Sequence, residues 1–157
     1  TMQEEISRFL AQCAEDRLDG DAADDVGTMI RGVNDLEAFA DHCYKLALLV
    51  DRALNRKAPL TGTVLEAIAH HAAQTHEFSA SYLQRMGTDL TEDEQAAAKR
   101  QCAKIDTARY KLIKMARRRI QSGENVKAEL LAIDILRHFE QIASCTLELC
   151  GDMVPAR

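Results

Sequence analysis

The stretch Leu36-Glu37-Ala38-Phe39-Ala40-Asp41-His42 decides the fold, because a related stretch, Phe139-Glu140-Gln141-Ile142-Ala143-Ser144-Cys145, follows later in the chain. Residues 30–50 can be laid on residues 133–153 so that Glu37 falls on Glu140. Apolar residues then coincide at Ile30/Ile133, Val33/Leu136, Leu36/Phe139, Ala40/Ala143, Leu46/Leu149 and Val50/Met153. Such self-similarity predicts two related halves, each carrying one copy of an amphipathic helix.

The composition favours an all-helical protein. The 157 residues include two prolines, three tyrosines, four phenylalanines and no tryptophan, and this length suffices for a core. The five cysteines form no CxxC pair, which indicates a reducing compartment rather than a disulfide framework or a zinc site. We recognise no signal peptide or membrane-spanning stretch. The abrupt start at Thr1-Met2 indicates a domain excised from a longer chain.

We expect five helices from the spacing of apolar residues and from the residues that begin and end helices. They lie at about 3–17, 22–56, 63–86, 92–121 and 125–151. Thr63-x-x-Glu66 and Thr91-x-x-Glu94 read as capping boxes, and Gly87 and Gly123 as helix ends. Short loops make successive helices antiparallel. The predicted fold is therefore an elongated, antiparallel, all-α bundle of about five helices. It forms a single domain over 1–157, with a partial first repeat at about 1–57 and a second at about 60–153.

A polar spot lies beside the apolar seam expected for the helix at 22–56. We predict this seam at Val26, Met29, Val33, Leu36, Ala40, Cys43, Ala47, Val50 and Leu54. Glu37 and Asp41 stand four positions apart next to it, so their carboxylates repel each other. A surface or internal salt bridge (to Arg109, Lys111 or Arg137), a shared proton or a cation held by oxygen ligands could compensate.

Charge is distributed unevenly although the net charge is only −5. Residues 1–41 hold eleven acids and three bases, whereas residues 99–119 hold nine bases and Asp106. The basic run is either a solvated helix face or a docking surface for an acidic partner or an anionic membrane. Its candidate partner-binding residues are Arg117, Arg118 and Arg119. Nucleic acid is not expected as a partner, because the chain is acidic and lacks a recognition motif.

No enzyme motif stands out. The chain has no G-x-S-x-G, no phosphate-binding glycine loop and no H-E-x-x-H. His70, His71 and His76 crowd the third helix, but none forms the His–His pair at i, i+4 of a helical metal site. We interpret them as core-edge or solvated residues. The chain is therefore not expected to be an enzyme.

The segment 34–43 resembles the Leu-Glu-Arg-Ile-Gly-Asp-His signature of PhoU proteins, which consist of two three-helix repeats. The matching residues are Leu36, Glu37, Asp41 and His42, and the departures are Ala38, Phe39 and Ala40. In the second copy the fitting residues are Phe139, Glu140 and Ile142, whereas Ser144 and Cys145 replace the aspartate and the histidine. The chain is most similar to the PhoU-like cytoplasmic tail of sodium/phosphate cotransporters, in which a short helix like 4–14 and a basic helix like 110–119 also occur.

This resemblance implies metal binding, by iron or another divalent cation, through Glu37 and Asp41. Glu140 would be half of a second site that Ser144 disables. The resemblance also implies a regulatory or adaptor domain of phosphate transport, located in the cytoplasm at the inner face of the membrane. Its partners would be the transporter's membrane domain and a second copy of the chain. The alternatives are a metal-independent helical interaction module and a carboxylate-metal enzyme.

Overall fold

The computed structural model describes residues 1–15, 20–55, 60, 62–88 and 90–152. These residues form the helices α1 (Met2–Glu15), α2 (Gly20–Asn55), α3 (Gly62–Leu83), α4 (Glu92–Gln121) and α5 (Val126–Asp152), and within these ranges no strand occurs. The all-α helical bundle predicted from the sequence is therefore confirmed. Its internal repeat remains a prediction. None of the described helices is both long enough and apolar enough to cross a membrane.

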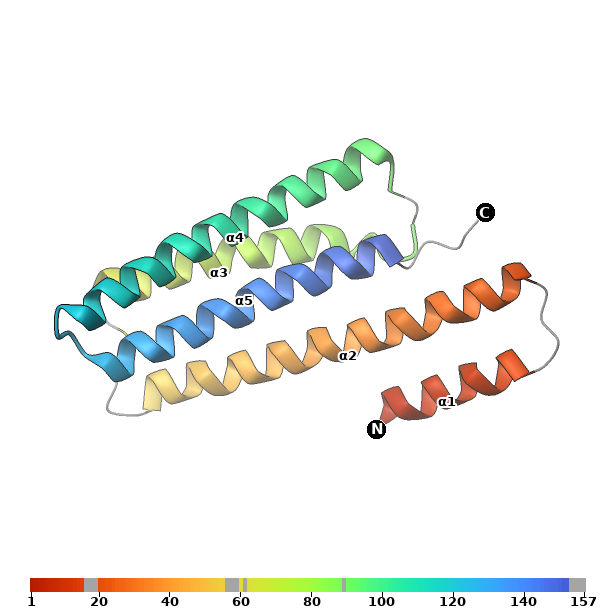
Figure 1. Cartoon of the computed structure of the whole chain (residues 1–157), viewed down its shortest axis with the longest axis horizontal. Helices are drawn as coiled ribbons and strands as arrows, with labels where there is room; N and C mark the ends of the chain where they lie inside the picture. Colours follow the sequence, from red (N-terminus) through yellow and green to blue (C-terminus); the bar gives the residue numbers. More distant parts are fainter. Residues whose placement is uncertain (16–19, 56–59, 61, 89, 153–157) are drawn as a thin grey trace.

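The last helix, α5, lies at the centre of the bundle (Figure 1). It packs against α2, α3 and α4, while α3 and α4 also pack against each other. α1 contacts α2 and no other described helix. Successive helices run in opposite directions along the long axis in Figure 1. The molecule is thus a three-helix bundle, α3–α4–α5, with the α1–α2 pair laid against the free side of α5.

The core follows α5 along its length. Ile135, Leu136 and Leu149 on this helix are completely or almost completely buried. One apolar cluster surrounds Ile135 and Leu136 and includes residues of α2, α3 and α4. A second cluster, nearer the other end, surrounds Phe78 of α3. A helix that is apolar on most of its circumference must be covered on most sides, which is the position that α5 occupies.

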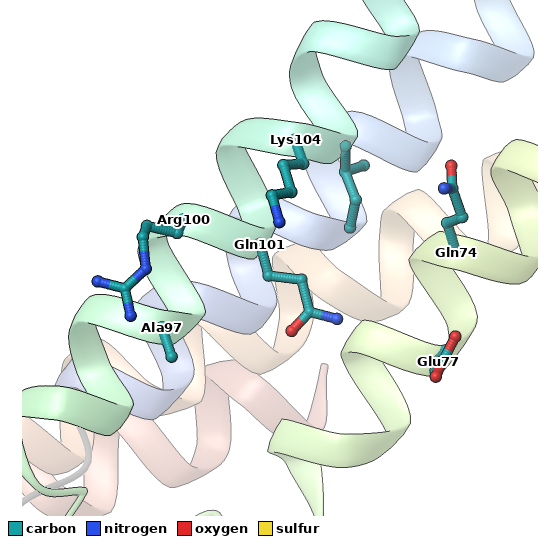
Figure 2. Close-up of a pocket in the computed structure, with 7 residues that line it drawn as sticks. Gln74, Glu77, Ala97, Arg100, Gln101 and Lys104 are labelled. Carbon is teal, nitrogen blue, oxygen red and sulfur yellow. The ribbon is translucent and has the colours of Figure 1, made fainter.

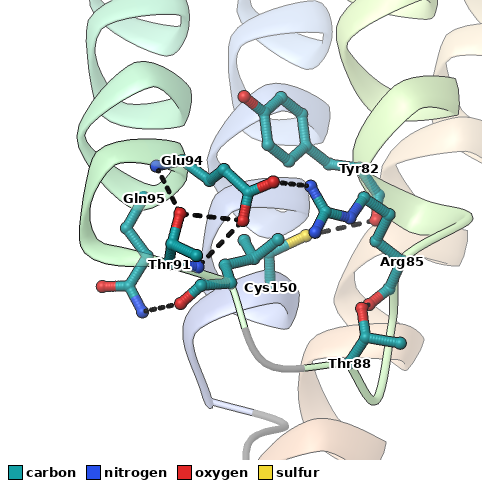
Figure 3. A network of polar contacts seen from close by, with 8 residues as sticks. Tyr82, Arg85, Thr88, Thr91, Glu94, Gln95 and Cys150 are labelled. Atoms are coloured by element: carbon teal, nitrogen blue, oxygen red, sulfur yellow. Dashed lines mark hydrogen bonds and ion pairs between the residues drawn. The ribbon is translucent and has the colours of Figure 1, made fainter.

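Local capping signals define the connection between α3 and α4 (Figure 3). Thr91 is the N-cap of α4 and forms the predicted capping box with Glu94. Arg85, at the end of α3, donates to Glu94 Oε1 at 2.6 Å. The bond from Arg85 and the bonds from Thr91 lower the pKa of Glu94 to about 2. Gly87 has φ of 76°, a left-handed conformation that glycine adopts without steric cost.

The seam predicted for α2 is wrong in part, because much of it faces outward. Met29, Leu36, Val50 and Leu54 are exposed, Leu54 to 78%. α2 packs on the core through a different stripe, which contains Ala53 with Leu46 and Leu49. α2 has two apolar stripes, and α5 covers only one of them. The three-to-four spacing is the same for both, so periodicity alone does not tell which stripe is buried.

Candidate functional site

The acidic pair predicted as a metal site lies on the exposed side of α2. Glu37 and Asp41 are both exposed. Lys45, one turn further along the same helix, places its Nζ 2.5 Å from Asp41 Oδ2. The hydrogen bond from Lys45 lowers the pKa of Asp41. The compensating charge that the sequence required for this pair therefore comes from α2 itself rather than from Arg109, Lys111 or Arg137.

Glu140, the third predicted metal ligand, belongs to α5 rather than to α2. It is half-buried on α5 and accepts a hydrogen bond from Gln141 at 2.8 Å. The pKa of Cys102 on α4 is raised by burial, then by Asp106 and by Glu140. Among the described residues, no group of three or more His, Cys, Asp or Glu side chains could hold a metal ion. A carboxylate metal site at Glu37, Asp41 and Glu140 stays a prediction.

Two histidines meet where α2 packs against α5. The Nδ1 atoms of His42 and His138 lie 3.2 Å apart, and the ring centroids are 5.4 Å apart with the planes tilted by 48°. Burial, followed by His42 and Lys45, lowers the pKa of His138. The sequence reasoning missed this pair because 96 positions separate the two residues. The available signal was the repeat, since both histidines lie in the two related segments.

The histidines of α3 divide into one core residue and two exposed ones. His71 is almost completely buried, whereas His70 and His76 are exposed. Neither ring nitrogen of His71 has a hydrogen-bond partner, and the ring meets Phe139 edge-on at 5.9 Å. Burial, then Arg109 and His70, lowers the pKa of His71. Burial in the core therefore disfavours the protonated form of this histidine.

The basic end of α4 is partly used inside the molecule. Arg119 makes two bonds to Glu129, from Nε to Oε1 at 2.6 Å and from Nη2 to Oε2 at 2.9 Å. Glu129 is only 4% exposed, so this bidentate pair links α4 to α5. Arg117 and Arg118 are exposed. Of the three predicted partner-binding arginines, these two present their charge to solvent.

Two of the pockets along α4 are lined largely by polar side chains. One, of about 350 Å³, is bordered mainly by cations; its lining residues are Arg109, Tyr110, Ile113, Lys114, Arg117 and Arg137. The other, of about 410 Å³, lies between α3 and α4. Its polar lining comes from Gln74 and Glu77 on α3 and from Arg100, Gln101 and Lys104 on α4 (Figure 2).

The C-terminal part of α2 carries several exposed large apolar side chains, and we term the surface that bears them the outer face of α2: Leu36, Tyr44, Leu48 and Leu54. Tyr44 is 65% exposed and Leu48 is 49% exposed. α1 runs beside the N-terminal part of α2 only (Figure 1). Gln3, near the start of α1, bonds to Asn34 at 2.6 Å. Beyond that point no described helix other than α5 contacts α2.

Comparison with known proteins leaves the function to be inferred from these surfaces. The chain matches no protein-family model, no curated protein and no solved structure. What the residues themselves establish is an all-α bundle with several exposed large apolar side chains on α2 and two histidines in contact where α2 packs against α5.

Proposed function

We propose that this chain is a regulatory or adaptor domain linked to phosphate transport or phosphate signalling, and that it binds its partner through the outer face of α2. The observation that supports the proposal is the group of large apolar side chains left exposed on this helix. Large exposed apolar patches on soluble proteins often mark binding sites. Within this group Tyr44 and Leu48 stand four positions apart, a spacing that suits docking against another helix.

The link to phosphate transport rests on the PhoU-like residues. Leu36 belongs both to the signature-like segment and to the outer face of α2, and the exposed Glu37 and Asp41 lie within the same stretch. A partner that docks on this face would therefore meet the residues that resemble the signature. The exposed Arg117 and Arg118 on α4 would meet an acidic partner or an anionic lipid surface.

A metal-independent interaction module is the second candidate function. It is favoured by the ion pair between Asp41 and Lys45, which already compensates one carboxylate of the predicted metal site. Metal analysis of protein purified without chelator separates the two candidates. A carboxylate site predicts bound metal that the double variant Glu37→Gln/Asp41→Asn loses, whereas a metal-independent module predicts equally little metal in both proteins.

The proposed function is tested by placing a charge on the outer face of α2. Leu48→Glu is compared with Leu65→Glu on α3, because both leucines are 49% exposed. In cells that depend on this protein for control of phosphate uptake, Leu48→Glu should abolish that control and Leu65→Glu should preserve it. Circular dichroism should show both variants folded. Unchanged uptake control in Leu48→Glu would contradict the proposal.

A further inference from the structure

The contact between His42 and His138 has the spacing of two ligands on one metal ion. Zinc–nitrogen bonds measure about 2.0–2.1 Å, so two nitrogens on a tetrahedral ion lie about 3.3 Å from each other. The two Nδ1 atoms are 3.2 Å apart. An ion between them would therefore require only small ring movements, and both rings come from long helices that hold them in place.

The surroundings of His138 favour its neutral ring, which is the form that binds metal. Burial, His42 and Lys45 lower the pKa of His138, while Asp134 and Asp41 act in the opposite direction. Both histidines are half-buried, so the site can be reached from solvent.

We infer that His42 and His138 form a transition-metal site where α2 packs against α5, which binds Zn²⁺ through the two Nδ1 atoms. Imidazole nitrogen is a ligand that suits Zn²⁺, Ni²⁺ and Cu²⁺. The described residues supply no cluster of three metal ligands, so water completes the coordination. This site is separate from the carboxylate pair at Glu37 and Asp41, and it does not depend on the proposed function.

A metal ion bound by both histidines would bridge α2 and α5. The two ligands stand 96 positions apart and meet only in the folded chain. A ligand that binds the folded state alone stabilises it by mass action. Zn²⁺ should therefore raise the melting temperature, and it should do so by strengthening the contact between the α1–α2 pair and the three-helix bundle.

Titration calorimetry with ZnCl₂ on the whole chain, freed of metal beforehand and kept in a non-chelating buffer, tests the inference. Wild type should bind one Zn²⁺ per chain. His42→Gln and His138→Gln should each weaken binding at least about tenfold, since losing even an outer-shell partner costs this much. His76→Gln, which changes an exposed histidine of α3, should bind as wild type does. So should Glu37→Gln/Asp41→Asn.

Glutamine is chosen because its amide can still hydrogen-bond to the remaining histidine, which preserves the fold while removing the metal ligand. Melting curves with and without Zn²⁺ provide a second readout. The upward shift expected for wild type should vanish in His138→Gln. The inference is overturned if His138→Gln binds Zn²⁺ as tightly as wild type, or if wild type takes up none at millimolar Zn²⁺. In the latter case the two rings form only a hydrogen-bonded pair.

Discussion

Helices α2 and α5 carry similar apolar patterns but occupy opposite kinds of environment. Three helices cover α5, whereas α2 is covered by α5 along one stripe and by α1 near its start. Leu149 of α5 is fully buried, while Leu46, which the repeat places at the same position of α2, is only partly buried. The burial of a side chain in this fold is therefore decided by the number of helices packed around its own helix, not by the apolar pattern of that helix.

The polar residues of the two helices differ in the same way. The acid of α2 that pairs with a base, Asp41, does so on the surface with Lys45 of its own helix. Glu129 of α5 is buried and pairs with Arg119 of another helix. An exposed pair within one helix contributes little to stability, whereas removing one partner of a buried pair leaves a charge without compensation.

The two helices also meet in a reciprocal register. The repeat lays position 35 on 138 and position 42 on 145. In the structure His42 contacts His138, and Asp35 is close enough to Cys145 to contribute, after burial and Glu148, to raising the pKa of that thiol to about 11. The histidine contact and the electrostatic influence of Asp35 thus involve pairs of positions that the predicted repeat would exchange.

The largest effect is expected from truncating repeat-related leucines. Leu149→Ala should lower the free energy of unfolding by about 3 kcal/mol, because it opens a cavity in a fully buried site. Leu46→Ala should cost about 1 kcal/mol, because the half-buried site can relax and admit water. Urea unfolding followed by circular dichroism measures both. Equal losses of unfolding free energy in the two variants would contradict the difference in burial between α2 and α5.

A smaller effect is expected from the ion pairs. Glu129→Gln should lower the free energy of unfolding by about 2 kcal/mol, since it leaves the Arg119 guanidinium without its carboxylate. Asp41→Asn on α2 should cause no measurable loss, because both partners of that pair are about half exposed. The two variants are compared by urea unfolding at neutral pH. A loss in Asp41→Asn as large as that in Glu129→Gln would contradict this reading.

The smallest effect is an acid-dependent loss of stability. The pKa values of His71 and His138 are lowered from the usual 6.5 in the folded chain. Below about pH 6.5 the unfolded chain binds protons that the folded chain does not, so stability is full above this pH and falls beneath it. His71→Leu should flatten the decline between neutral and mildly acidic pH, and His76→Leu should leave it unchanged. Parallel pH profiles for wild type and His71→Leu would show that another group controls the decline.

Local features of the fold could be predicted from the sequence. The capping box Thr91-x-x-Glu94 and the helix ends near Gly87 and Gly123 involve residues within a few positions of one another. The interactions that cap these helices are therefore specified by short segments of the sequence. The five helices follow from such signals together with the apolar spacing, and each predicted helix lies close to an observed one.

The site could not be predicted to the same extent, because it depends on which faces meet. α2 has two apolar stripes, and only the presence of α5 determines that Leu46 and Leu49 turn inward while Leu36 and Leu54 stay exposed. The contact of His42 with His138 requires both the packing of α2 against α5 and its register. Likewise, nothing local shows that Arg119, unlike Arg117, finds a buried carboxylate. These contacts join residues that are far apart in the sequence, so the apolar pattern of one helix does not predict them.

The central position of α5 has a consequence for how the chain acquires its structure during synthesis. Before α5 emerges from the ribosome, the described contacts between helices reduce to two separate hairpins, α1 with α2 and α3 with α4. Each hairpin then exposes the apolar stripe that α5 later covers, and such surface is prone to aggregation. The core of the nascent chain is therefore completed only when α5 has been synthesised. Slow translation between Gln121 and Asp152 would prolong the period in which chaperones are needed.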